Sequence, residues 1–404
     1  MLSHWHLYYY HDGNRYTIGL ADLPVTGFRL KYASRAADEL RLTLEAAPSI
    51  FSPADLWQHF ERGRSYALTC DAFPVSGGGT TNKPMFYGRL ETTETANTGT
   101  SRKIVLVFKG CWHYLTLAMY RPNTTSVTLG GYTHTATEWS QYILWLAARA
   151  APGKGIFYPS GSPEHDIPAH IPASVSSLYL PEFTARDITY AQALDAILAF
   201  WPDVVSYPAW TAVDLDLASS PCPQLCLGTP SVVQRLSDIL AGATDGGDLV
   251  SQNVELRPGV PGVRVYAEDG TRSAQIGNPD DLGGLMYTLD PSLAQYAFYW
   301  DGFSNRYASE VPYYIYGQTQ AARPEGSVEL VGKIPPGLFH LSRNKLLSLE
   351  IGESATVMQS IEFDIAQGRT TINFGNPPSV DLDNLVSMIR ANFFGSWHFA
   401  MNRR

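Results

Sequence analysis

The chain has 404 residues, and its 38 acidic side chains outnumber its 29 basic ones to give a formal net charge of −9. This charge argues against a general nucleic-acid-binding protein, because binding to phosphates needs a basic surface. Hydrophobic residues make up 45% of the sequence and aromatic residues 12%, which excludes disorder for most of the chain. Only 17% of the residues are charged, while Gly and Pro number 34 and 27, and this composition favours a β-rich fold.

Neither a membrane-spanning helix nor a secretory signal is expected. No run of about 18 apolar residues is present. The opening sequence MLSHWHLYYYHDG lacks a basic segment followed by an apolar one. The four cysteines are too few for a disulfide framework in a chain of this length. We therefore expect a protein made in the cytosol, without stable insertion into a membrane.

The first 120 residues predict a series of strands. Two of them flank the turn sequence HDGN at residues 11–14, as in a hairpin. Residues 39–45 alternate leucine with polar side chains, which indicates a strand with one wet face. Residues 103–109 contain five consecutive apolar side chains, as a strand covered on both faces would. Further strands are predicted at residues 66–73 and 85–95, and a polar loop at 96–101.

Helices are predicted in the middle of the chain. Thr135 with Glu138, and Thr189 with Gln192, have the spacing of capping boxes at helix starts. The Pro/Ser/Gly-rich residues 152–181 predict a long irregular connection between these two helices. A shorter helix is predicted at residues 232–241.

Strand patterns return after residue 249. The predicted strands are residues 254–256, 263–267, 286–289, 313–316 and 328–331, followed by a hairpin of 356–365 with 369–374. A last helix is predicted from Asp381, ending at Gly395. No internal repeat of 20–50 residues is present, which argues against solenoids and propellers.

No pattern of metal ligands emerges from the sequence. Cys222 and Cys226 form a single pair, whereas zinc needs four ligands. His4 and His6 have no acidic residue at a matching spacing. Residues 164–170 combine Glu, Asp and two His, but they lie in the Pro-rich connection, where a solvated loop is the ordinary interpretation. We expect no metal and no cofactor.

Catalytic patterns are also weak. A Gly-x-Ser-x-Gly elbow is missing, and the glycine run at 77–79 lacks the Lys-Ser/Thr of a phosphate loop. Asp214 with Asp216, and Glu91 with Glu94, are candidate carboxylate pairs for a glycoside hydrolase, and aromatic side chains could stack on sugars. The same excess of Tyr and Trp is expected of protein–protein interfaces.

Several segments, taken in their order, resemble the tail-hub proteins of long-tailed bacteriophages, which are related to the base of type VI secretion spike proteins. The matching segments are residues 38–44, the FYGRL sequence at 86–90, 105–115, 189–205, 255–266 and 357–375. The second-barrel entry departs from the family pattern at Arg257-Pro258-Gly259, and residues 270–325 have no counterpart.

The resemblance implies a mainly β protein with helical insertions (α+β). It implies a first tail-tube-like antiparallel β-barrel at residues 1–120 and a helix-containing insertion at 121–202. A second barrel at 203–380 would carry an irregular insertion at about 270–325, and residues 381–404 would form a C-terminal helix and an aromatic tail.

The implied function is structural and not enzymatic. A homotrimer would form a baseplate hub that adapts the six-fold tail tube to a three-fold spike or tip. Its partners would be the tail tube, spike or tip, and tape-measure proteins, and the genome would pass through the lumen without sequence-specific binding. The protein would belong to the virion tail, assembled in the cytoplasm of the bacterial host. A carbohydrate-binding or carbohydrate-cleaving β-rich protein is the alternative.

The aromatic C-terminus is the predicted subunit interface. Phe393, Phe394, Trp397 and Phe399 gather around a glycine that should end the last helix. Such side chains dominate interface energetics when they enter a neighbour. Packing against the chain's own barrel is the other interpretation.

Overall fold

A computed structural model gives the arrangement of the chain. The residues that it describes are 2–11, 14–46, 59–74, 80–98, 101–117, 127–129, 132–134, 189, 191–192, 195, 205–209, 224–228, 230, 232–242, 247–289, 299–301, 306–308, 312, 315–316, 319–320, 323–332, 345–350 and 355–375.

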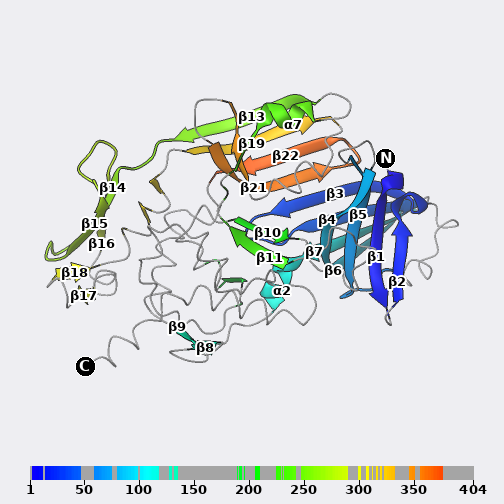
Figure 1. Ribbon diagram of the computed structural model, residues 1–404, viewed down its shortest axis with the longest axis horizontal. Helices are drawn as coiled ribbons and strands as arrows, with labels where there is room; N and C mark the ends of the chain where they lie inside the picture. The colour runs from blue at the N-terminus through cyan, green and yellow to red at the C-terminus, as the bar shows by residue number, and fades with distance from the viewer. Residues whose placement is uncertain are drawn as a thin grey trace.

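One large antiparallel sheet organises most of these residues (Figure 1). Its strands follow the order β13-β19-β22-β21-β3-β4-β7-β6-β5-β1-β2. The early strands are β1 (Trp5–His11), β2 (Asn14–Gly19), β3 (Val25–Ala33), β4 (Glu39–Ala46), β5 (Ser65–Pro74), β6 (Thr80–Thr98) and β7 (Ser101–Gly110). The late strands are β13 (Asp248–Arg257), β19 (Arg323–Val331), β21 (Ala355–Asp364) and β22 (Arg369–Phe374). The chain is therefore mainly β, as the composition predicts.

The two halves of the sheet meet at the ladder between β3 and β21. This antiparallel ladder runs from the pair Ala33–Ser360 to the pair Arg29–Asp364. Buried side chains on one face of both halves form a single hydrophobic core, which includes Leu30 of β3 and Phe363 of β21. The halves are thus joined by main-chain hydrogen bonds and by shared apolar packing.

The first half of the sheet curls over its own core. The alternating Leu40, Leu42 and Leu44 of β4 are fully buried, as the sequence pattern predicts. Trp5 of β1 packs edge-on against Phe28 of β3 with 4.9 Å between the ring centroids, although β1 and β3 are not neighbours in the strand order. Among the described residues no ladder closes this half into a barrel, because β3 pairs with β21. The two predicted barrels are therefore not confirmed.

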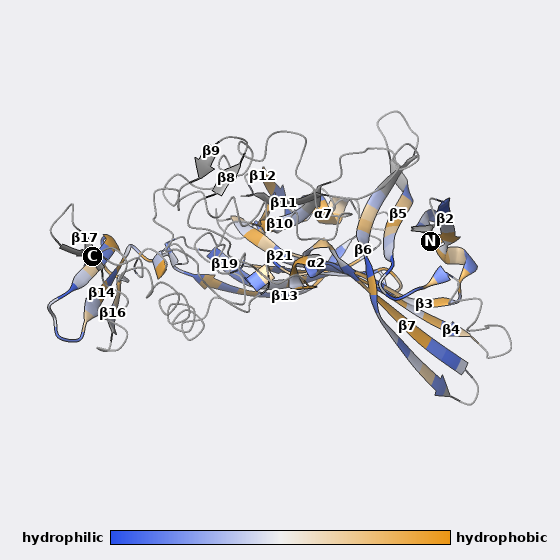
Figure 2. Ribbon diagram, turned by 90° about the horizontal axis from the view of Figure 1, so that it is seen from below, coloured by the Kyte–Doolittle hydropathy of each residue, from blue (hydrophilic) through white to orange (hydrophobic). Residues whose placement is uncertain are grey.

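The hairpin of β6 and β7 is longer than the sequence predicts. β7 has the expected run of five buried residues, Ile104 to Phe108. The polar loop predicted at 96–101 is too long, because residues 96–98 and 101 belong to the two strands and pairing continues to Thr98 opposite Ser101. Thr92, Thr93 and Thr95 favour the extended backbone. Figure 2 shows this end of the hairpin projecting as a hydrophilic extension of the sheet.

The glycine of the FYGRL motif marks a close approach of two strands. Gly88 of β6 directly faces Gly110 of β7. A Cβ atom on Gly88 would lie 2.3 Å from the carbonyl oxygen of Lys109, and one on Gly110 would lie 2.8 Å from Cβ of Asp38. Both positions require glycine because no side chain fits between the backbones.

Smaller elements cover and flank the sheet. β12 (Val232–Arg235) pairs in parallel with β20 (Lys345–Ser348), which pairs with β21. The remaining elements are η1 (Leu2–His4), η2 (Leu20–Asp22), α2 (Cys111–Leu117), β8 (Val127–Leu129), β9 (Tyr132–His134), β10 (Val205–Ala209), β11 (Gln224–Gly228), α7 (Leu236–Ala241), β17 (Tyr299–Asp301) and β18 (Arg306–Ala308). Within the described residues, no helix is both long and apolar enough to cross a membrane.

A separate three-stranded sheet lies at one end of the molecule (Figure 1). It contains β14 (Gly262–Ala267), β15 (Ser273–Gly277) and β16 (Leu285–Leu289). β14 and β16 are parallel, and Val263 and Val265 of β14 are fully buried. Two of these strands, β15 and β16, fall within the segment expected to be an irregular insertion, at about 270–325.

The helix predictions had mixed outcomes. The Thr189 capping box is confirmed: the backbone N–H of Gln192 donates to Thr189 Oγ1, and that of Thr189 donates to Gln192 Oε1. The predicted helix at 232–241 begins only at Leu236, because the preceding residues form β12. The predicted strand at 313–316 is wrong, since its described residues are helical and Gln320 N–H donates to the carbonyl of Tyr316. The predicted helices at 135–150 and 381–395, and the connection at 152–181, lie outside the described residues.

Candidate assembly surface

The face of the sheet opposite to the core is polar and crosses both halves of the chain. Residues that pair across neighbouring strands share a face, so the ladder registers define its rows. One row, from β13 to β6, contains Ser251, Glu329, Thr371, Glu362, Lys31, Glu39, Lys109 and Arg89. The next row contains Val331, Arg369, Asp364, Arg29, Arg41, Val107 and Thr92. We call these two rows the polar face.

Ion pairs balance the charge on the polar face. At the joint, Arg29 Nε lies 3.0 Å from Asp364 Oδ2, and Arg29 Nη1 lies 4.0 Å from Glu362 Oε1. Further pairs are Arg369 with Glu329 at 2.9 Å, Arg41 with Glu94 at 3.7 Å, and Lys109 with Glu39. Exposed pairs of this kind add little stability. Their effect is a wet surface that is neither strongly acidic nor strongly basic, despite the chain's net charge.

Two open edges border this part of the sheet. β13 pairs with β19 on one side and has no described neighbour on the other. β6 pairs with β5 only up to Arg89, so its residues 91–98 pair with β7 alone. Apolar side chains remain uncovered along β13, where Leu256 is 66% exposed and Val250 is 50% exposed. Both edges carry backbone groups that another strand could pair with.

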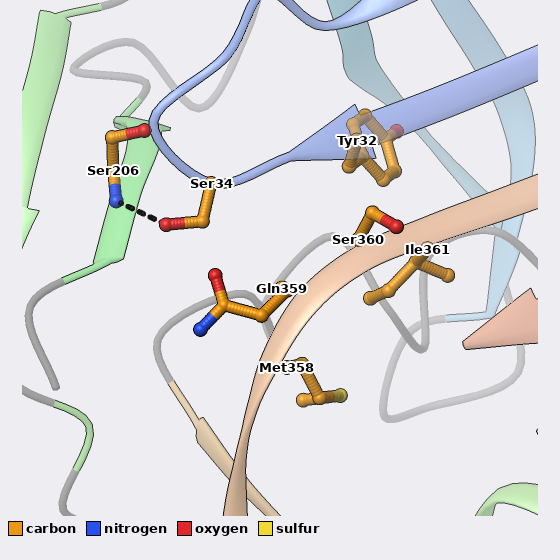
Figure 3. A pocket seen from close by; sticks show the side chains of 7 residues that line it. All are labelled: Tyr32, Ser34, Ser206, Met358, Gln359, Ser360 and Ile361. Carbon is orange, nitrogen blue, oxygen red and sulfur yellow. Dashed lines mark hydrogen bonds between the residues drawn. The ribbon is translucent and has the colours of Figure 1, made fainter. Parts of the chain in front are cut away.

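A small pocket marks the joint between the two halves (Figure 3). Its volume is about 10 Å³, room for roughly one water molecule. It is lined by Tyr32, Ser34, Ser206, Met358, Gln359, Ser360 and Ile361. A β-bulge of β21 lies here, between Met358 and Ser360. The pocket is too small for a substrate and belongs to the packing of the joint.

Hydrogen bonds at the joint connect three distant parts of the sequence. The N–H of Arg35 donates to Ser206 Oγ at 2.7 Å, and the N–H of Ser206 donates to Ser34 Oγ at 3.2 Å. The N–H of Ser34 donates to the carbonyl of Gln359 at 2.7 Å. Ser206 is nearly fully buried. The sequence alone does not reveal this site, because no local pattern links serines more than 150 residues apart.

The candidate carboxylates lie beside basic side chains. Glu91 lies in a bulge of β6, where its Oε1 is 2.9 Å from Arg89 Nε and 3.2 Å from His113 Nε2. Glu94 pairs with Arg41. Asp214 and Asp216 lie outside the described residues. The structure therefore brings no pair of these carboxylates together across a cleft.

The candidate metal ligands are only partly described. His4 Nδ1 lies 2.7 Å from Asp71 Oδ1, and His6 Nε2 lies 3.4 Å from Asp71 Oδ2. Asp71 comes from the neighbouring strand β5, a pairing that sequence spacing could not reveal. In the described part of the chain, no three His, Cys, Asp or Glu side chains are placed to hold a metal ion.

The predicted aromatic interface lies outside the described residues. This applies to Phe393, Phe394, Trp397 and Phe399, and also to Cys222 and residues 164–170. Cys70 and Cys111 are buried, and neither is part of a disulfide. The surface features that the structure does describe are the polar face, the two open edges and the joint.

A curled antiparallel sheet with a balanced polar face defines a β-rich scaffold. Its fold is similar to that of a phage tail protein. The 43 kDa tail protein of prophage MuSo2 from Shewanella oneidensis matches with a TM-score of 0.50 and 11% identity, over 93% of this chain and 100% of that one. At this identity the likeness establishes the fold alone.

Two other solved structures are similar over most of this chain. Prophage tail protein gp18 from Listeria monocytogenes has a TM-score of 0.47 at 8% identity, over 97% of this chain and 100% of that one. A chain of the Francisella PdpA-VgrG complex has a TM-score of 0.49 at 7% identity, over 92% of this chain and 57% of that one. No family model and no curated protein matches the sequence.

Proposed function

We propose that this chain is a structural protein of a phage tail or baseplate, and specifically a tail hub. The observation that carries the proposal is the continuous sheet with a polar face and two open edges. The shared fold with the MuSo2 tail protein supports it. A sheet with these features is suited to forming the wall of a ring, because its edges are available to neighbouring copies and its polar face is compatible with water.

The strand order makes the two edges complementary. Seven antiparallel ladders separate β13 from β6, so these strands run in opposite directions. In a head-to-tail ring, β13 of one copy would meet residues 91–98 of the next copy in the same antiparallel sense. Neither segment contains proline or lysine, the residues that proteins use to block exposed edges.

The finer features of the hub rest on the sequence resemblance. Three copies would close the ring, with the chain divided at residues 1–120, 121–202, 203–380 and 381–404. Each half of the sheet would belong to one barrel of the tail-tube type. The partners would be the tail tube, the spike or tip, and the tape-measure protein, and the polar face would line the lumen. Balanced charge would suit passage of the genome, since a basic wall would hold phosphates.

Cysteine cross-linking tests the ring. Asn253→Cys in β13 is combined in turn with Thr92→Cys, Glu94→Cys or Ala96→Cys in β6, three exposed positions that share the polar side of the sheet with Asn253. We expect at least one pair to give covalent trimers on a denaturing gel, and ring-shaped particles of trimer mass by electron microscopy and native mass spectrometry. The control pairs Asn253→Cys with Thr17→Cys, an exposed position on β2. A chain that stays monomeric at high concentration would overturn the hub proposal.

A further inference from the structure

The two open edges of the sheet carry opposite charge. β13 and its neighbour β19 contain four acidic and two basic side chains, a net charge of −2. Residues 89–98 of β6 and the whole of β7 contain four basic and two acidic side chains, a net charge of +2. We call the first pair of strands the acidic edge and the second the basic ribbon. The sheet is therefore nearly balanced as a whole, but its charge is divided along the strand order.

The charges that create this division have no counter-charge within the described part of the chain. There, Asp248 and Glu255 of β13 are exposed and form no ion pair with a basic side chain. Arg102 and Lys103 of β7 likewise have no carboxylate partner, and Arg102 Nε donates instead to Asn97 Oδ1 at 3.1 Å. Other charges of these strands are paired inside the chain. Two anions and two cations thus remain available at the two edges.

We propose that these charges set the order of the copies in the ring, with the acidic edge of one copy docking on the basic ribbon of the next copy. This inference rests on the proposed ring and adds the means by which one copy recognises another. Lys103 faces Ala96, which lies in the part of β6 that pairs with β7 alone. A β13 strand added there would lie about 10 Å from β7, two strand spacings away, and charges interact over this distance at moderate salt.

The same charges oppose the pairing of identical edges. In an antiparallel pair of two β13 strands, Asp248 of each copy would lie towards Glu255 of the other, because these residues are near opposite ends of the strand. Like charges that face each other across strands are destabilising. Two basic ribbons would repel each other in the same way. The distribution of charge therefore favours a head-to-tail seam, which can close into a ring, over a two-fold dimer.

Charge reversal of each edge, and then of both, tests the seam. The acidic-edge variant carries Asp248→Lys and Glu255→Lys, which changes the charge of that edge from −2 to +2. The ribbon variant carries Arg102→Glu and Lys103→Glu, which changes the ribbon from +2 to −2. Each variant has like charges on both sides of the seam, so we expect monomers in sedimentation velocity at a concentration where the wild type is a trimer. The quadruple variant has opposite charges again and should regain the trimer.

Recovery in the quadruple variant separates charge from other effects. Lysine can block an exposed edge by itself, but that effect would persist when the ribbon is also reversed. The matched control is Glu268→Lys with Asp281→Lys, the same change of charge at two exposed positions beside the separate three-stranded sheet, and it should assemble as the wild type does. Raising NaCl from 0.1 M to 1 M shortens the screening length from about 10 Å to about 3 Å. We expect the concentration for half-assembly of the wild type to rise about tenfold.

The possible results separate this inference from the ring itself. A trimer that survives either single-edge reversal would overturn the role of charge and leave the ring in place. A quadruple variant that has the circular dichroism spectrum of the folded protein but stays monomeric would do the same. A wild-type chain that never forms trimers would overturn the ring and this inference together.

Discussion

Replacing Gly88 by alanine tests the close approach of β6 and β7 at the FYGRL motif. The new Cβ would lie 2.3 Å from the carbonyl oxygen of Lys109 and 2.5 Å from Cζ of Phe86. The first of these atoms belongs to the backbone of β7, and Gly110 sits directly opposite. Relief would require the two strands to separate within a ladder whose neighbouring side chains are buried. Overpacking of this kind costs about 1–3 kcal/mol.

Thermal unfolding measures the effect. At ~2–4 °C per kcal/mol, the value for domains of 150–250 residues, we expect Gly88→Ala to lower Tm by roughly 2–12 °C. The control is Gly27→Ala in β3, where the added Cβ would meet only the side chain of Thr43, at 3.0 Å. Thr43 is partly exposed and its Oγ1 can rotate away, so that a single 3.0 Å contact with its Cβ remains. Equal losses of Tm in the two variants, or no loss in Gly88→Ala, would refute the argument.

Three further predictions concern pH, the β13 edge and the C-terminus. Burial raises the pKa of Asp195 in the folded state to about 7, so its contribution to the free energy of unfolding is full below pH ~4, declines as pH rises, and is lost above ~7. Chemical denaturation should therefore show the free energy of unfolding of Asp195→Asn rising relative to that of the wild type across this window. A difference that does not change with pH would contradict the prediction. Gly326→Ala places a Cβ 1.9 Å from the carbonyl oxygen of Asn253 at a φ of +141°, so hydrogen exchange should show β13 losing its protection while β4 keeps its own. Deleting residues 395–404 should abolish the trimer mass in sedimentation without changing the Tm of the monomer; a lower Tm would instead support packing of these aromatics on the chain's own barrel, and an intact trimer would exclude the anchor.

Local patterns predicted most of the strands in the first half of the chain. The alternation of Leu40, Leu42 and Leu44 places one face in the core, and the five apolar residues of β7 indicate burial on both faces. These patterns work because each reports burial of neighbouring side chains. The capping box of Thr189 and Gln192 is likewise formed by residues three apart.

Long-range pairing could not be predicted in the same way. The ladder between β3 and β21 joins Arg29 to Asp364, residues separated by most of the chain, and alternation alone does not specify a partner strand. The error at residues 313–316 has a related cause, since a short apolar run fits a strand or a helix equally well. The joint and the open edges, which form the candidate surface, depend on this long-range pairing.

The contacts of the candidate carboxylates bear on the carbohydrate alternative. A glycoside hydrolase needs two carboxyl groups that face each other across a sugar, one of them able to hold a proton. Glu91 instead lies within a strand bulge beside Arg89 and His113, and Glu94 pairs with Arg41 of the polar face. Among the described residues, these side chains are therefore partners of neighbouring basic side chains, and they do not face each other across a cleft.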